Sequence, residues 1–242
     1  MKTIGDAAGA DGAPFAETHH ALLFAWMAKA VCERAGDERG EEIIRLAVRR
    51  YGEERGRRMA ARAKANGHAL DIIDYFAYSE FKTRTGAMNQ TLAARGQDLR
   101  LLNTKCPWYT AWDESGLMKW GCLYCREIDS AVLRGFNPEL KLDVVGTRSN
   151  GSATCDFIFH GAKMGLRNGV RLLYRKTFRP GTKAIQSWDY HVGHLFTTLE
   201  KAIIGELGES GHKAVDSALN VFAERYGEGD SQRVLAYRRV FT

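Results

Sequence analysis

The stretch from Leu140 to Phe159, which reads LKLDVVGTRSNGSATCDFIF, decides the fold class. Residues 140–147 alternate apolar and polar side chains, and residues 153–159 do so again, which is typical of β-strands with one buried face. Asn150-Gly151 between them is a strong hairpin-turn sequence. The stretch therefore predicts an antiparallel hairpin whose second strand puts Cys155, Phe157 and Phe159 on one face and Thr154, Asp156 and Ile158 on the other.

Working outward from this hairpin, residues 98–104 predict another strand, which ends at Cys106-Pro107 because proline cannot continue a ladder. A further strand is expected over residues 170–178. Apolar residues recur at helical spacing elsewhere, which predicts helices over residues 18–35, 40–65, 71–81, 113–134 and from 188 onward, including 213–226. The predicted fold class is α+β, a small antiparallel sheet flanked by paired helices.

The first and last helical segments resemble each other. Phe24, Lys29-Ala30 and Gly36 have the same spacing as Phe196, Lys201-Ala202 and Gly208, and both copies continue to Tyr-Gly-Glu, the second after about one extra helical turn. This spacing favours a duplicated helical hairpin.

We predict a loose N-terminal tail over residues 1–17, which is rich in Gly and Ala, and one α+β domain over residues 18–242. Within that domain, we expect residues 18–97 to form a helical part and residues 98–180 to form the sheet together with the predicted helix 113–134. Residues 188–242 are expected to form the C-terminal helices.

The composition of the 242 residues limits the classes of function. The net charge is +6, but the basic residues alternate with Glu and apolar residues and match no nucleic-acid-binding motif, so we expect no nucleic-acid partner. The charge suits a small anionic substrate by electrostatic steering. No apolar run reaches bilayer length and no secretory leader is recognisable, so we expect a cytoplasmic protein without a membrane partner. A homo-oligomer stays open.

Five cysteines, an odd number, argue against a disulfide framework and for free thiols with a chemical or packing role. Cys125 and Asp129 are four residues apart on the predicted helix 113–134 and would share one face. A carboxylate alone does not activate a thiol, so the pair needs a base, for which His191 and His194 are the candidates. The alternative is a buried Cys125 and a solvated Asp129.

Metal binding is a second alternative. Cys122-x-x-Cys125 lies in the middle of a predicted helix, whereas redox motifs of this kind stand at a helix N-terminus. A zinc site would need two more ligands, which Cys106, Cys155 or the two histidines could supply. We predict no cofactor and leave the metal content open.

Several motifs together resemble the L-2-amino-thiazoline-4-carboxylic acid hydrolase family. They are Cys106-Pro107, Ala111-Trp112, Glu114-x-Gly116-Leu117, Tyr124-Cys125, Ile128-Asp129, Gly135-Phe136-Asn137-Pro138 and Cys155-x-Phe157, followed by Asp189-Tyr190-His191-x-x-His194-Leu195 and Leu207-Gly208-Glu209. The resemblance covers about residues 18–226. Cys122 does not belong to the pattern, which weakens a CxxC interpretation.

The resemblance implies an enzyme that opens a C–N bond in a small nitrogen heterocycle with help from a thiol. On this basis Cys125 is the expected nucleophile, Asp129 its partner and His194 the base, with Cys106 and Cys155 lining the same site. Trp112, Asn137 and His191 are the candidates for substrate contact, and Arg126, Arg134 or Arg148 could bind a ring carboxylate. The alternatives are a metal-dependent hydrolase with the same residues and a non-catalytic small-molecule-binding or sensor domain of the vinyl-reductase type.

Overall fold

A computed structural model describes residues 13–177 and 181–241, which leaves most of the predicted tail, residues 1–12, outside the described residues. The chain divides into two compact units. Residues up to 47 and from 187 onward form the helical unit, and residues 48–186 form the sheet unit. The prediction of one domain over residues 18–242 is not tested by this division.

The helical unit contains α1 (Glu17–Ala35), the start of α2 (Asp37–Ala65), α9 (Trp188–Leu207), α10 (Glu209–Tyr226), α11 (Glu228–Ala236) and the 3-10 turn η2 (Tyr237–Arg239). Helices α1, α9 and α10 pack against one another. Both helix pairs turn at a single glycine with positive φ, Gly36 (83°) and Gly208 (54°), a conformation that glycine adopts without strain. These are the two glycines that the internal sequence similarity aligns; a shared origin of the pairs stays a prediction.

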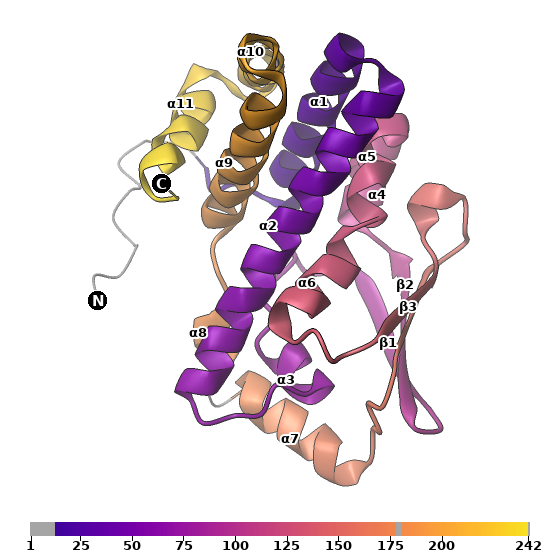
Figure 1. The fold of residues 1–242 in the computed structure, drawn as a ribbon. Helices are drawn as coiled ribbons and strands as arrows, with labels where there is room; N and C mark the ends of the chain where they lie inside the picture. Colours follow the sequence, from indigo (N-terminus) through magenta and orange to yellow (C-terminus); the bar gives the residue numbers. More distant parts are fainter. Residues whose placement is uncertain (1–12, 178–180, 242) are drawn as a thin grey trace. The chain divides into compact units, whose positions relative to one another are not determined.

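The sheet unit contains the rest of α2 together with shorter elements. In chain order these are α3 (Ile72–Ala77), β1 (Asn89–Arg95), β2 (Asp98–Lys105), α4 (Pro107–Glu114), α5 (Met118–Cys125), α6 (Ile128–Phe136), β3 (Leu142–Gly146), η1 (Arg148–Asn150), β4 (Cys155–Phe159), α7 (Leu166–Thr177) and α8 (Gly181–Ala184). The four strands form one antiparallel sheet in the order β1-β2-β4-β3 (Figure 1). The predicted α+β class with a small antiparallel sheet is thus confirmed.

The predicted alternation along β4 is confirmed as well. Leu99, Cys155, Phe157 and Phe159 belong to one hydrophobic core cluster, whereas Asp156 on the opposite face pairs with Arg100, 2.7 Å from Asp156 Oδ2 to Nη2. The inner face of the sheet therefore meets the helices, and the ion pair lies on the outer face.

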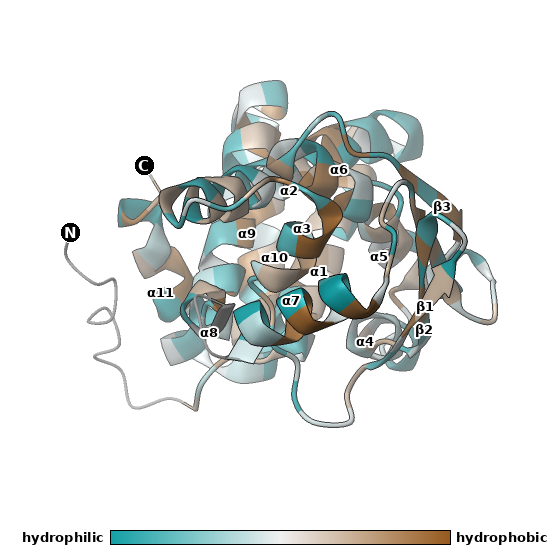
Figure 2. Cartoon of the chain, turned by 90° about the horizontal axis from the view of Figure 1, so that it is seen from below, coloured by the Kyte–Doolittle hydropathy of each residue, from teal (hydrophilic) through white to brown (hydrophobic). Residues whose placement is uncertain are grey.

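Two predicted elements are wrong. Residues 113–134 do not form one helix, because α4 ends at Glu114, Gly116 takes φ 66°, and a turn at residues 126–127 separates α5 from α6. Residues 170–178 were expected to form a strand, but α7 occupies residues up to Thr177; Phe178 lies outside the described residues. Figure 2 shows hydrophobic and hydrophilic residues on different sides of α7, whose most exposed apolar side chain is Leu166.

Among the described residues, none of the helices is both long enough and apolar enough to cross a bilayer.

Candidate active site

A cavity of about 250 Å³ lies in the sheet unit between the inner face of the sheet and the helices. Its apolar wall is aromatic and aliphatic, with Phe76, Phe81, Trp108, Leu101, Ile128, Val132, Phe157 and Phe159. Its polar groups include Arg55, Asn103, Asp129, Gln90, Thr147 and three cysteines, Cys106, Cys125 and Cys155. We call it the cysteine cavity. A concave pocket with an apolar wall and convergent polar groups is the usual form of a small-molecule site.

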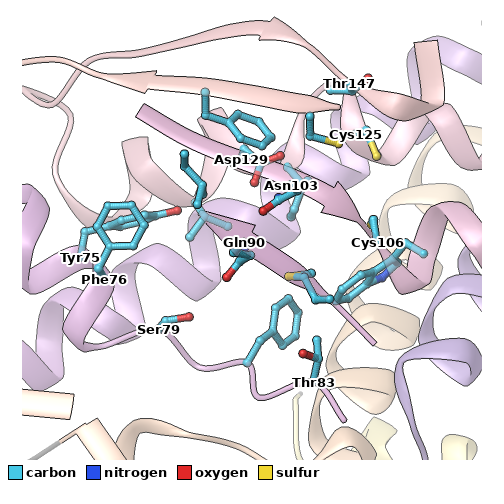
Figure 3. Close-up of a pocket in the computed structure, with 18 of the residues that line it drawn as sticks. Tyr75, Phe76, Ser79, Thr83, Gln90, Asn103, Cys106, Cys125, Asp129 and Thr147 are labelled. Atoms are coloured by element: carbon cyan, nitrogen blue, oxygen red, sulfur yellow. The ribbon is translucent and has the colours of Figure 1, made fainter. Parts of the chain in front are cut away.

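The three cysteines reach the cavity from three different elements. Cys106 is the N-cap of α4, Cys125 is the last residue of α5, and Cys155 is the first residue of β4. Figure 3 shows Cys125 beside Thr147 at one end of the cavity and Cys106 on another wall. The prediction that these thiols gather at one place agrees with this geometry.

Each thiol receives a hydrogen bond from a nearby loop or helix start. The Arg148 N–H lies 3.4 Å from Cys155 Sγ, Ser149 bonds the Cys125 thiol, and the Tyr109 N–H points at Cys106. Such donors favour the thiolate, but burial disfavours it more strongly. The pKa of Cys106 is raised to about 11, that of Cys125 is well above its usual range, and that of Cys155 is also raised. In the free protein the thiols are therefore protonated at neutral pH.

Asp129, in the first turn of α6, is the carboxylate of this cavity. Burial raises its pKa to about 6, and the positive charge of Arg55 acts in the opposite direction. Asp129 in turn raises the pKa of Cys125, as one negative charge disfavours another. A carboxyl group with a pKa near 6 is well suited to exchange protons at neutral pH.

Packing between two helices fixes the position of Asp129. A Cβ on Gly56 of α2 would lie 2.2 Å from the Val132 carbonyl oxygen, and one on Gly135 would lie 2.3 Å from the Glu53 carbonyl oxygen. The backbones of α2 and α6 thus touch at these glycines. This contact fixes the position of Asp129 on α6 relative to the cavity-lining residues of α2.

The other predicted site residues lie elsewhere. Trp112 is fully buried against Gly121, and Asn137 donates to the Leu70 carbonyl oxygen at 2.9 Å; neither lines the cysteine cavity. His191 and His194 are buried in the helical unit, where His194 packs on Tyr190 and Phe241. Their role as base or substrate contact stays a prediction.

The sequence does not decide whether the protein binds a metal ion. In the part of the chain that the structure describes, no group of three or more His, Cys, Asp or Glu side chains is placed to hold a metal ion. Cys122 does not line the cavity, and its thiol donates to the Lys119 carbonyl oxygen at 3.2 Å.

Sequence reasoning missed Arg55, because it lies in a charged segment of α2 that resembles a solvated helix face. The structure instead gives a side chain that is 5% exposed and lines the cavity. One feature of the sequence could have indicated that Arg55 is buried. It lies three residues after Gly52 and one before Gly56, in a stretch whose glycines allow close packing. The arginines proposed for a ring carboxylate do not line the cavity; Arg134, for example, pairs with Glu53 at 2.8 Å.

One comparison with known families gives a match. The family model of L-2-amino-thiazoline-4-carboxylic acid hydrolase matches residues 16–159. The chain belongs to this family. The matched region includes Cys106, Cys125, Asp129 and Cys155 and ends before His191 and His194. Neither the curated proteins nor the solved structures contain a match to this chain. The family name indicates a hydrolase of a thiazoline carboxylate.

Proposed function

We propose that this protein hydrolyses a C–N bond in a small nitrogen heterocycle, of the cyclic amidine, amide or thiazoline type, inside the cysteine cavity. The observation that carries the proposal is the convergence of three cysteines and Asp129, all within the matched family region, on one cavity. Core packing alone does not require three thiols and an ionisable carboxyl group to face an empty space of this size.

In the proposed mechanism Cys125 is the nucleophile. Its proton passes to the Asp129 carboxylate, and Sγ then attacks the electrophilic ring carbon. The ring C–N bond breaks and the leaving nitrogen takes the proton from Asp129. Water, deprotonated by Asp129, adds to the same carbon, the C–S bond breaks, and the thiol regains its proton. One water is consumed and the ring is opened.

The raised pKa of Cys125 has to be overcome during this reaction. A cyclic amidine is protonated at neutral pH, and such a cation beside Cys125 and Asp129 would favour the thiolate. We therefore expect the bound substrate, and not the free protein, to activate the thiol. His194 remains our proposed additional base, and the His194→Gln variant tests this role separately.

Cys155 is the competing nucleophile, because the Arg148 N–H donates to its sulfur and the Arg148 charge favours its thiolate. The test is turnover of L-2-amino-thiazoline-4-carboxylate and related cyclic amidines by Cys106→Ser, Cys125→Ser and Cys155→Ser. We expect Cys125→Ser to lower kcat by about a thousandfold or more and the other two to retain more activity. A Cys155→Ser variant that is the most impaired would move the nucleophile to Cys155.

One observation favours a second function. Burial raises the pKa of all three cavity thiols, which is the state of cysteines that form an apolar wall and do not react. A non-catalytic small-molecule-binding domain would have such a cavity. This alternative predicts that the wild type retains the cyclic amidine without converting it and that Asp129→Asn changes affinity alone.

A further inference from the structure

Arg55 is a buried cation that faces the cysteine cavity with incomplete pairing. Its side chain is 5% exposed, and its guanidinium stacks 3.7 Å from the centre of the Phe81 ring. The nearest carboxylate oxygen in an ion pair, Glu80 Oε2, lies 3.7 Å from Nε, too far for a hydrogen bond. Among the described residues, Arg55 Nε has no hydrogen-bond partner.

Glu80 is already used by two other arginines of α2. Arg62 Nη1 donates to Oε1 at 2.6 Å, and Arg58 Nη2 donates to Oε2 at 3.1 Å. Both of these arginines are more exposed than Arg55. One carboxylate therefore serves three arginines, and its single negative charge does not balance all of them. A buried charge in this state is costly unless a ligand supplies the missing partner.

Asn103 of β2, which also lines the cavity, has a buried acceptor without a partner in the described part of the chain. It is 8% exposed, and its Oδ1 has no hydrogen-bond partner among the described residues. In the sheet register Gln90, Asn103 and Cys155 stand opposite one another on β1, β2 and β4, and all three line the cavity. Residues directly opposite in register share one face of a sheet, and Figure 3 shows Asn103 with Asp129 and Gln90 around the middle of the cavity.

The lining of the cavity also carries charges of both signs. Arg55 is positive, and Asp129, with a pKa of about 6, is largely negative at neutral pH. Lys176 on α7 is a second cation of the lining, and burial lowers the pKa of its amine, which weakens its positive charge. A ligand with one carboxylate and one protonated amidine would place opposite charges against Arg55 and Asp129.

We infer that Arg55 is the carboxylate receptor of the cysteine cavity and that Asn103 accepts a hydrogen bond from a ring N–H of the same ligand. This inference rests on the proposed function for the position of the reacting ring, but it concerns binding and does not require turnover. The guanidinium fork suits a planar carboxylate, with which it forms two parallel N–H···O bonds. Beyond the proposed function, two lining residues are thus assigned to two groups of one ligand, Arg55 to the carboxylate and Asn103 to the ring N–H.

The test uses L-thiazolidine-4-carboxylate and its primary carboxamide. Both have a ring N–H, and neither has the amidine carbon that the proposed reaction attacks. Calorimetry at pH 7.5 gives the two dissociation constants for the wild type, Arg55→Gln, Arg55→Lys and Arg57→Gln. Arg57 is exposed on the same helix and does not line the cavity, so Arg57→Gln is the matched control.

We expect the wild type and Arg57→Gln to bind the carboxylate about ten- to a hundredfold more tightly than the carboxamide, as for a charge-assisted hydrogen bond. Arg55→Gln should lose this preference. Arg55→Lys should keep a preference but bind the carboxylate more weakly, because it lacks the fork. Lack of carboxylate binding by the wild type, equal binding of both probes, or an undiminished preference in Arg55→Gln would overturn the inference.

If Arg55→Gln fails to fold, Arg55→Lys becomes the deciding variant. Carboxylate binding by Arg55→Lys as tight as that of the wild type would contradict the two parallel hydrogen bonds that we assign to the Arg55 guanidinium. The outcome is independent of the proposed hydrolysis. A carboxylate preference with no turnover of any cyclic amidine would keep the Arg55 assignment and reject the enzyme, and turnover with no preference would do the reverse.

Discussion

The positive charge of Arg55 on α2 lowers the pKa of Asp129 on α6, while burial raises it to about 6. The two residues line one cavity, and the glycine contacts between their helices fix their separation. The carboxyl group that we propose as proton acceptor is therefore tuned by the residue that we propose as carboxylate receptor.

The pH dependence of the reaction follows from this relationship. If Asp129 must be ionised to accept the thiol proton, kcat/KM rises with pH through about 6. Removing the Arg55 charge in Arg55→Gln removes the influence that lowers this pKa, so the acidic limb should move to higher pH. The dependence of kcat/KM on pH, recorded for the wild type and for Arg55→Gln, measures the position of this acidic limb. An acidic limb that stays in place or moves to lower pH would contradict the coupling.

Asp129 should also reduce stability at neutral and alkaline pH. Its folded pKa of about 6 lies above the ordinary 3.8, so the folded state disfavours ionisation. The penalty is complete above pH 6 and disappears as the pH falls toward 4, and the difference between the two pKa values corresponds to about 3 kcal/mol. Asp129→Asn should therefore stabilise the protein by about 2 kcal/mol at pH 8 and hardly at all at pH 4.

Urea unfolding at both pH values measures this difference, with the exposed Asp113→Asn as the control. Equal stability of Asp129→Asn and the wild type at pH 8 would show that the carboxyl group is not penalised by burial.

The glycine contacts between α2 and α6 predict a packing requirement. Gly56→Ala brings a methyl group to within 2.2 Å of the Val132 carbonyl oxygen, so the helices must separate. We expect a loss of roughly 1–3 kcal/mol or more in the free energy of unfolding, together with weaker binding in the cavity. In the control, Gly205→Ala in α9, the methyl group meets no atom within 4 Å, and it should stabilise by up to about 1 kcal/mol. A neutral Gly56→Ala would disprove the close contact.

The cavity thiols should react slowly with alkylating agents in the free protein. Because burial raises the pKa of Cys106 to about 11 and raises that of Cys125 well above its usual range, few thiolates exist at pH 7.5. Iodoacetamide labelling followed by peptide mass mapping should show slow modification of both compared with the unfolded chain, and faster modification as the pH rises. Rapid labelling of Cys125 at pH 7.5 would mean that its thiolate is already formed without substrate.

The hairpin could be predicted because apolar residues alternate along both strands and Asn150-Gly151 lies in the connection between them, although β4 is buried along its whole length and β3 is mostly exposed. Strand β1 could not, because every residue of Asn89–Arg95 is exposed and leaves no alternation. The helix over residues 113–134 was wrong because Gly116 and the turn at residues 126–127 interrupt an apolar pattern that continues on both sides.

The candidate site was predictable for the cysteines and Asp129, which occur in motifs at the ends of elements. Arg55 was not predictable, since the charged residues around it on α2 resemble a solvated surface. Only the position of the cavity shows that this arginine faces inward while Arg58 and Arg62 pair with Glu80. The strand prediction over residues 170–178 was wrong because apolar residues of α7, such as Val170 and Leu173, are exposed to solvent. Their spacing therefore does not mark the buried face of a strand.

The most direct measurement is turnover of L-2-amino-thiazoline-4-carboxylate by the wild type and by Cys125→Ser, with intact-protein mass spectrometry of the quenched reaction. The account predicts a ring-opened product and a covalent adduct on Cys125 in the wild type, and neither in Cys125→Ser. Undiminished product formation by Cys125→Ser would contradict the nucleophile, and binding without any product from this or a related cyclic amidine would contradict the hydrolase.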